Sequence, residues 1–91
     1  MAYIDKFGVE YSDDKEILVK CPRDFEGELI IPEYVEMIEP DAFIGCTKLT
    51  SVVFPKHFGY INDHLFDGCM GLMIAEIPYG KKYSLTWKKT L

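Results

Sequence analysis

The sequence lacks the features that mark several common protein classes. No apolar run approaches the length of about 18–20 residues that a membrane-spanning helix needs. The first residues, Met1 to Phe7, have no basic stretch followed by a long apolar one, as a signal peptide would. Cysteine is sparse and odd in number, whereas small secreted scaffolds carry dense, even sets. We therefore expect free thiols and a cytoplasmic location. The cell surface is the alternative location if a signal peptide has been removed.

Positive charge is also scarce. The chain has ten Lys and Arg against fifteen Asp and Glu, a net charge of −5. Residues 77–91 hold four lysines and no acid, so residues 1–76, with six basic and fifteen acidic residues, carry −9. An acidic body repels nucleic-acid phosphates, and nucleic acid is not expected as a partner. The 91 residues, 48% hydrophobic, predict one thin-cored globular domain.

No catalytic or metal-binding constellation stands out. The C-x-x-C and H-x-x-x-H spacings of zinc sites are absent, as is a glycine-rich phosphate loop. His57 or His64 could activate Cys69, but a Cys-His dyad needs a partly exposed thiolate. The acids between Glu33 and Asp41 are typical of a solvated edge rather than of a glycosidase pair. We predict no enzymatic activity, no cofactor and no metal, with a Cys-His hydrolase as the less favoured alternative.

What the sequence does contain is an internal repeat with an offset of 23 residues. The two copies, residues 27–49 and 50–72, read GELIIPEYVEMIEPDAFIGCTKL and TSVVFPKHFGYINDHLFDGCMGL. The residues that recur unchanged are Pro32/Pro55, Ile38/Ile61, Phe43/Phe66, Gly45/Gly68, Cys46/Cys69 and Leu49/Leu72. A third, partial copy covers residues 73–79 and keeps the Ile-Pro pair. One copy cannot bury its own apolar residues, so the copies must stack.

Each unit has a simple physical logic. An L-x-x-L-x-L spacing predicts strands near 28–31, 51–54 and 74–77, with alternate side chains pointing inward. A proline ends each strand because it has no N–H to donate. Short helical turns are expected near 40–45 and 63–68, each placing its Phe in the core and ending at a glycine with positive φ. Cys46 and Cys69 should stack inside as buried thiols, although a disulfide between them is a geometric alternative.

The pattern resembles the BspA-type leucine-rich repeat family. The same frame continues to Leu72, and the residues that carry the resemblance are Ile31-Pro32, Val35, Ile38, Ala42-Phe43, Gly45-Cys46, Leu49, Val52 and Phe54-Pro55. The segment YSDDKEILVKCP at 11–22 and IPYGKKY at 77–83, followed by Trp87, are also similar to the family's opening and closing segments. The resemblance covers residues 9–88. It implies a right-handed solenoid that binds proteins or surfaces without enzymatic activity.

The predicted fold class is therefore an α/β solenoid with short strands and short helical turns, in a single domain spanning residues 1–91. An N-terminal β-hairpin is predicted at 7–21, with strands Phe7–Tyr11 and Ile17–Cys21 around a Ser-Asp-Asp-Lys turn. A C-terminal cap is predicted at 80–91. Tyr79, Tyr83 and Trp87, spaced by four with lysines between, allow an amphipathic helix instead. An uncapped last strand would recruit another chain, so we expect a monomer or a weak edge-mediated dimer.

The predicted function is a non-enzymatic protein-interaction or scaffold module that binds a protein partner through its strand face. The residues between the inward positions form two outward columns of that face. The candidate binding residues are Glu28, Ser51 and Ile74 in one column, and Ile30, Val53 and Glu76 in the other. Ile30 and Val53 are apolar where solvent is expected, which suggests a contact patch. The alternative is a structural fragment or end-cap of a longer repeat array.

Overall fold

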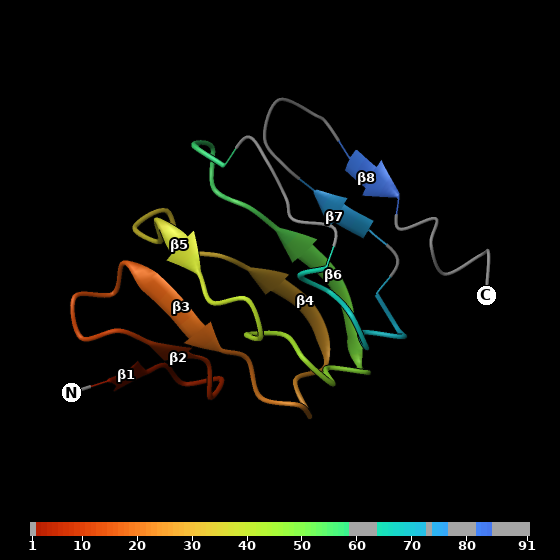
Figure 1. Ribbon diagram of the computed structural model, residues 1–91, viewed down its shortest axis with the longest axis horizontal. Helices are drawn as coiled ribbons and strands as arrows, with labels where there is room; N and C mark the ends of the chain where they lie inside the picture. Colours follow the sequence, from red (N-terminus) through yellow and green to blue (C-terminus); the bar gives the residue numbers. More distant parts are fainter. Residues whose placement is uncertain (1, 59–63, 73, 77–81, 85–91) are drawn as a thin grey trace.

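The computed structural model describes the whole chain except residues 1, 59–63, 73, 77–81 and 85–91. Its strands form two four-stranded sheets, in the orders β1-β2-β3-β5 and β4-β6-β7-β8 (Figure 1). Their bounds are β1 (Tyr3–Ile4), β2 (Glu10–Tyr11), β3 (Ile17–Lys20), β4 (Gly27–Ile30), β5 (Met37–Ile38), β6 (Leu49–Val53), β7 (Ile74–Glu76) and β8 (Lys82–Ser84). The described part of the chain is strand-rich and contains no helix.

The first sheet is built on the predicted hairpin. β2 and β3 pair antiparallel, although the first strand is shorter than expected, and β1 extends the sheet beyond β2. The turn forms through local side-chain bonds: the Ser12 hydroxyl accepts from the amide of Ile17 at 3.1 Å and donates to the Asp14 carboxylate at 2.7 Å. Lys15 takes a positive φ of 66° in this turn. β5 completes the sheet by pairing parallel with β3, which the sequence pattern did not predict.

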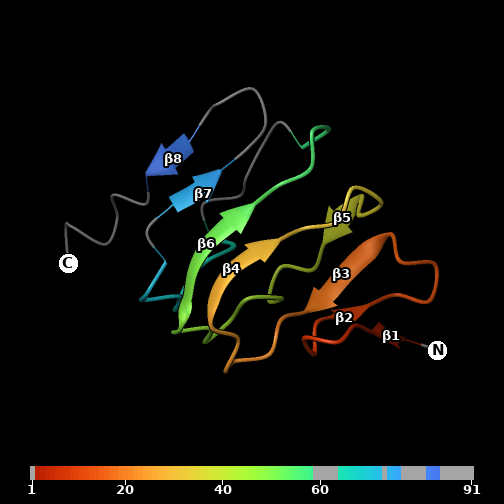
Figure 2. The same cartoon turned by 180° about the vertical axis from the view of Figure 1, so that it is seen from behind.

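The second sheet carries the repeat. β4, β6 and β7 run parallel, and their register joins residues 23 apart, as Ile30 to Val53 and Val53 to Glu76 (Figure 2). Parallel strands need a crossover connection, and here each connection is the remainder of one repeat unit. The predicted strands near 28–31 and 51–54 are confirmed to within two residues. β7 confirms the third, apart from Ile77, which lies outside the described residues.

The predicted helical turns are wrong. Residues 40–45 and 64–68 form hydrogen-bonded turns instead of helices. In the first unit the amides of Ala42, Ile44 and Cys46 each bond the carbonyl three residues earlier. These bonds engage every second amide, whereas a 3₁₀-helix needs successive ones. Gly45 at φ 74° and Gly68 at φ 84° then end the turns, as predicted.

The core lies between the two sheets and the turns. It is wholly apolar among the described residues, with buried side chains from both sheets and both turns. Phe43 and Phe66, the recurring aromatics of the two units, lie in contact with ring centroids 5.2 Å apart. Leu49 and Leu72 are fully buried in equivalent places. The stacking of one unit on the next therefore rests on the residues that recur.

The C-terminal segment differs from the amphipathic helix that was considered for it. Residues 82–84 form β8, which pairs antiparallel with β7 and so covers that strand's outer edge. Tyr83 therefore lies in a strand, because a free sheet edge offers it backbone partners that a short isolated helix lacks. Tyr79 and Trp87, the other members of the proposed stripe, lie outside the described residues.

Candidate protein-binding face

The strand register assembles the two predicted columns. Glu28 pairs with Ser51 and Ser51 with Ile74, while Ile30 pairs with Val53 and Val53 with Glu76. Neighbouring strands in a sheet lie about 4.7–4.9 Å apart, so each column is a continuous row across β4, β6 and β7. The placement of Ile74 and Glu76 rests on the backbone register alone.

The side chains of β4 and β6 alternate between the core and the outer face. Leu29 and Val52 are buried, whereas Ile30 is 65% exposed and Val53 is half-buried. In the adjacent column, the Ser51 hydroxyl donates a hydrogen bond to the Glu28 carboxylate over 3.2 Å. On β4 and β6 the face thus sets two apolar residues beside two polar ones, whereas on β7 the order reverses, with Ile74 next to Ser51 and Glu76 next to Val53. Such a face offers a partner both apolar area and a fixed hydrogen-bonding group.

The cysteines belong to the buried core of the molecule. Cys21, Cys46 and Cys69 are free thiols and fully buried. The Cys69 thiol donates to the carbonyl of Phe43 at 3.0 Å, and the Cys46 thiol to the carbonyl of Cys21 at 3.5 Å. Equivalent thiols therefore each bond the backbone of the preceding coil. The Cys46–Cys69 disulfide that the sequence allowed is not formed.

Burial also makes these thiols poor nucleophiles. It raises the pKa of Cys46, an effect partly opposed by the hydrogen bond with Cys21 and by the charges of Lys20 and Arg23. The pKa of Cys21 is raised too, first by burial and then by the neighbouring Cys46. A reactive cysteine needs a lowered pKa and access to solvent. Neither Cys21 nor Cys46 meets these conditions.

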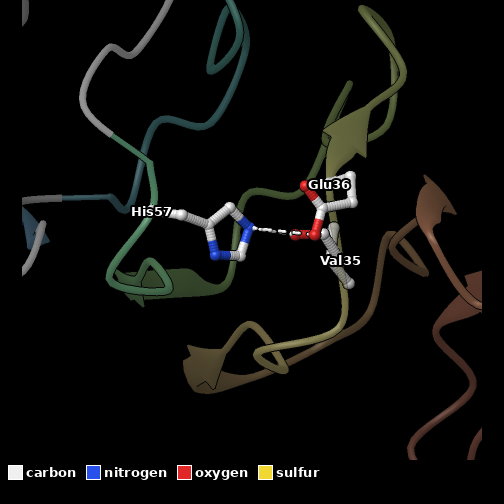
Figure 3. A network of polar contacts seen from close by, with 3 residues as sticks. All are labelled: Val35, Glu36 and His57. Carbon is white, nitrogen blue, oxygen red and sulfur yellow. Dashed lines mark hydrogen bonds and ion pairs between the residues drawn. The ribbon is translucent and has the colours of Figure 1, made fainter.

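The two histidines make contacts other than the considered Cys-His pair. His57 reaches back to the first unit, where its Nε2 lies 2.6 Å from the carbonyl oxygen of Val35 and 3.8 Å from the Glu36 carboxylate (Figure 3). The carbonyl can only accept, so Nε2 carries the proton in this contact. His64 lies exposed beside Asp67, at 3.3 Å. His57 thus serves as a link between coils.

The acids of the first unit lie on its surface. Glu33, Glu36 and Asp41 are exposed, and Glu39 is half-buried. No group of three His, Cys, Asp or Glu side chains within the described part of the chain is arranged to hold a metal ion. The described residues include no helix that is long and apolar enough to span a membrane.

A groove beside β4 is the feature that sequence reasoning missed. It has a volume of about 560 Å³ and is open to solvent. Its lining combines three aromatic and three aliphatic or proline side chains with four acids: Phe7, Tyr11, Phe25, Leu29, Ile30, Pro32, Asp5, Asp24, Glu26 and Glu28. One part of the signal is visible in the sequence, where Asp24, Glu26 and Glu28 alternate. Asp5 and Phe7 join them only through the fold.

The hydroxyl of Tyr11 anchors one wall of this groove. Tyr11 is buried, and its hydroxyl lies 3.4 Å from the Asp5 carboxylate. Burial and then the charge of Asp5 raise the pKa of Tyr11, so its hydroxyl keeps its proton and donates to Asp5. Asp5 also accepts from the amides of Phe7 and Val9. The loop carrying Phe7 is therefore held in place by one carboxylate.

Comparison with known proteins finds one likeness. No curated protein and no solved structure matches the chain. A family model described as the BspA type leucine rich repeat region (6 copies) matches residues 24–86, which includes both repeat units and all four strands of the second sheet. Repeats of this kind serve generally in protein interaction rather than in catalysis. The chain belongs to the BspA-type leucine-rich repeat family.

Proposed function

We propose that the protein is a non-enzymatic interaction or scaffold module that binds a protein partner through the outer face of β4, β6 and β7. The observation that carries this proposal is the exposure of Ile30. Its neighbours Leu29 and Ile31 are buried, whereas Ile30 exposes 65% of its surface next to the half-buried Val53. An apolar pair on an exposed strand face is stabilised when a partner covers it.

The repeat supports a face of this kind. If the units continue as a right-handed solenoid, the same positions of each unit line up, and their outward residues form one surface. With three parallel strands this surface is small. We therefore expect an interface at or below the standard size, and a weak or transient complex. We also propose a monomer, since β8 covers the edge of β7, with a weak edge-mediated dimer as the alternative.

The test is affinity capture from a lysate of the native cell with three forms of the full chain. The first is the natural sequence and the second carries Ile30→Asp with Val53→Asp. The control carries Ile44→Asp with Met70→Asp, two exposed apolar residues that lie in turns rather than on strands. Circular dichroism and thermal melting establish that all three forms are folded.

We expect the natural form and the control to retain the same partner, and the face variant to lose it. Charges placed in an apolar contact remain buried without a counter-charge, which costs several kcal/mol. A partner that binds the face variant and the control equally would refute this face as the binding site. Retention of no partner by any form would favour a structural role within a longer repeat array.

A further inference from the structure

β4 is an end strand of the second sheet, and its edge away from β6 pairs with no other strand in the described part of the chain. The amides of Gly27 and Ile31 donate to the carbonyls of Lys48 and Val53, so the odd-numbered residues of β4 direct their backbone groups toward β6. Backbone groups alternate along a strand, and those of Glu28 and Ile30 therefore point away from β6. Among the described strands, only β6 has Cα atoms within 8 Å of β4. This edge therefore offers hydrogen-bonding groups for an added strand.

The groove beside β4 runs along this same edge. Glu28, Leu29, Ile30 and Pro32 line one side, and the loop with Asp5 and Phe7 lines part of the other. Phe7 is 61% exposed and packs edge-on against Phe25, with ring centroids 6.4 Å apart. An extended segment seated here would meet backbone groups on one side and aromatic rings on the other. These are the two components of recognition by strand addition.

The charge of the groove indicates what kind of segment fits. Four carboxylates line it, from Asp5, Asp24, Glu26 and Glu28, and no Lys or Arg is among the described residues of the lining. An acidic or phosphorylated ligand would be repelled, whereas lysine or arginine side chains would be attracted. The volume of about 560 Å³ suits a few residues of an extended chain rather than the side of a folded domain.

We propose that this groove binds a short extended peptide segment that adds to the free edge of β4 and carries lysine or arginine on both sides of an apolar residue. The segment accepts from and donates to the backbone of Glu28 and Ile30. Its apolar residue contacts Phe7 and Phe25, and its cations face the four carboxylates. This site shares Glu28 and Ile30 with the strand face, but it adds the backbone edge of β4 and the loop of Asp5 and Phe7 and uses no residue of β6 or β7.

The test uses fluorescence anisotropy on the full chain with two labelled peptides. One alternates lysine with valine and phenylalanine, and the other has glutamate in place of each lysine. We expect the basic peptide to bind with an affinity that falls as salt is raised, and the acidic peptide not to bind. Equal binding of both peptides, or binding of neither, would overturn the proposal. That result would not affect the strand face, which the lysate capture tests separately.

Two variants of one residue isolate the backbone contact. Ile30→Pro removes the isoleucine side chain and the backbone N–H that points away from β6, whereas Ile30→Ala removes the side chain and keeps that N–H. No bond to β6 is lost in either, because the Ile30 amide faces away from that strand. Loss of one hydrogen bond should weaken binding by about three- to tenfold in Ile30→Pro relative to Ile30→Ala. Equal affinities would show that the peptide does not add to β4.

A charge variant keeps the proposal testable should the proline variant unfold. Asp24→Asn with Glu26→Gln retains the shape of the groove and removes two of its charges. We expect weaker binding with a shallower dependence on salt, and an unchanged salt dependence would contradict the proposal. Light scattering is run on the same samples. A concentration-dependent dimer that the basic peptide does not dissociate would show that a second copy occupies the edge, and would also overturn it.

Discussion

The two repeat units are alike inside and unlike outside. The positions that are identical and buried in both are Phe43/Phe66, Cys46/Cys69 and Leu49/Leu72. At exposed positions the chemistry changes, from Asp41 to His64 and from Ile44 to Asp67. Interior positions of a stacked repeat meet their own counterparts in the next coil, so they are constrained by packing. Exposed positions lack that constraint, and their differences are where a specific function can reside.

At one position of the repeat, the side chain contacts the preceding coil in both units although the residue type differs. Tyr34 of the first unit and His57 of the second are equivalent, and each reaches back to the preceding coil. The ring of Tyr34 packs edge-on against Tyr11 with centroids 6.1 Å apart, whereas His57 bonds the carbonyl of Val35. The geometry of the repeat therefore determines where a side chain reaches. The neighbour that it meets determines which residue type is useful.

The largest effect is expected from removing the shared interior. Phe43→Ala and Phe66→Ala should each lower the free energy of unfolding by about 3–5 kcal/mol, because each leaves a cavity beside the other ring. Small domains have a total stability of about 5–15 kcal/mol, so both variants will be close to unfolding. Urea unfolding followed by circular dichroism measures the loss. A control, Ile44→Ala, should change stability by less than about 0.5 kcal/mol because Ile44 is exposed.

The similarity of the two interiors would be contradicted if one of the two phenylalanines could be replaced without a loss of stability. Both rings are fully buried in the same cluster, so we expect the two losses to be similar. A loss below about 1 kcal/mol in either variant, where 3–5 kcal/mol is typical, would mean that the interior of that unit is not packed as described.

The next effect tests whether the two turns end in the same way. Gly45 and Gly68 both have positive φ, where an L-residue with a Cβ is strained. Gly45→Ala and Gly68→Ala should each cost about 1–2 kcal/mol for the left-handed backbone alone. A Cβ at Gly68 would make ordinary contact with Gly45, so no collision adds to that cost. Thermal melting measures both, and a stabilised variant would contradict the positive φ.

The repeat made part of this structure predictable. The offset of 23 residues gave the order of the parallel strands and the pairing of Glu28 with Ser51, because a stacked repeat pairs equivalent positions. The buried thiols and the glycine conformations followed from the same frame. The turns were mistaken for helices because Asp-Ala-Phe in the first unit and His-Leu-Phe in the second fit both structures, and the bonding of alternate amides distinguishes them.

Other features could not be predicted because they depend on segments far apart in the sequence. β5 is only Met37–Ile38, too short to show a strand pattern, and it pairs with β3 about twenty residues earlier. The groove beside β4 needs the loop of Asp5 and Phe7 next to residues 24–32. Nothing local to either segment indicates the other. The strand face, by contrast, could be predicted because its residues follow the repeat.

A smaller effect is expected at the position where the units differ. His57→Phe keeps an aromatic ring beside Phe58 and removes the bond to the Val35 carbonyl, so it should cost about 1 kcal/mol. Tyr34→Ala removes the edge-on contact with Tyr11 and should cost a similar amount. Urea unfolding measures both, with the exposed Lys56→Ala as the control. A His57→Phe variant as stable as the natural chain would show that the contact in Figure 3 does not link the coils.

The smallest effect lies outside the repeat, in the hairpin turn that neither unit contains. The hydroxyl of Ser12 and then the amide of Glu16 donate to the Asp14 carboxylate and lower its pKa. Ser12→Ala should therefore raise the pKa of Asp14 toward its ordinary value, as measured by NMR titration of the carboxyl group.

The lowered pKa of Asp14 also makes the stability of the fold depend on pH. A carboxyl group whose pKa is lower in the folded state stabilises the fold at pH values above its ordinary pKa, and this stabilisation is lost as the pH falls through the lowered pKa. The difference in stability between the natural chain and Ser12→Ala should thus shrink in acid, down to the part due to the Ser12–Ile17 bond, which does not titrate. Because Asp14 is fully exposed, solvent screening keeps the pH-dependent part small. An Asp14 pKa that is the same in both forms would show that the Ser12–Asp14 bond does not contribute to the turn.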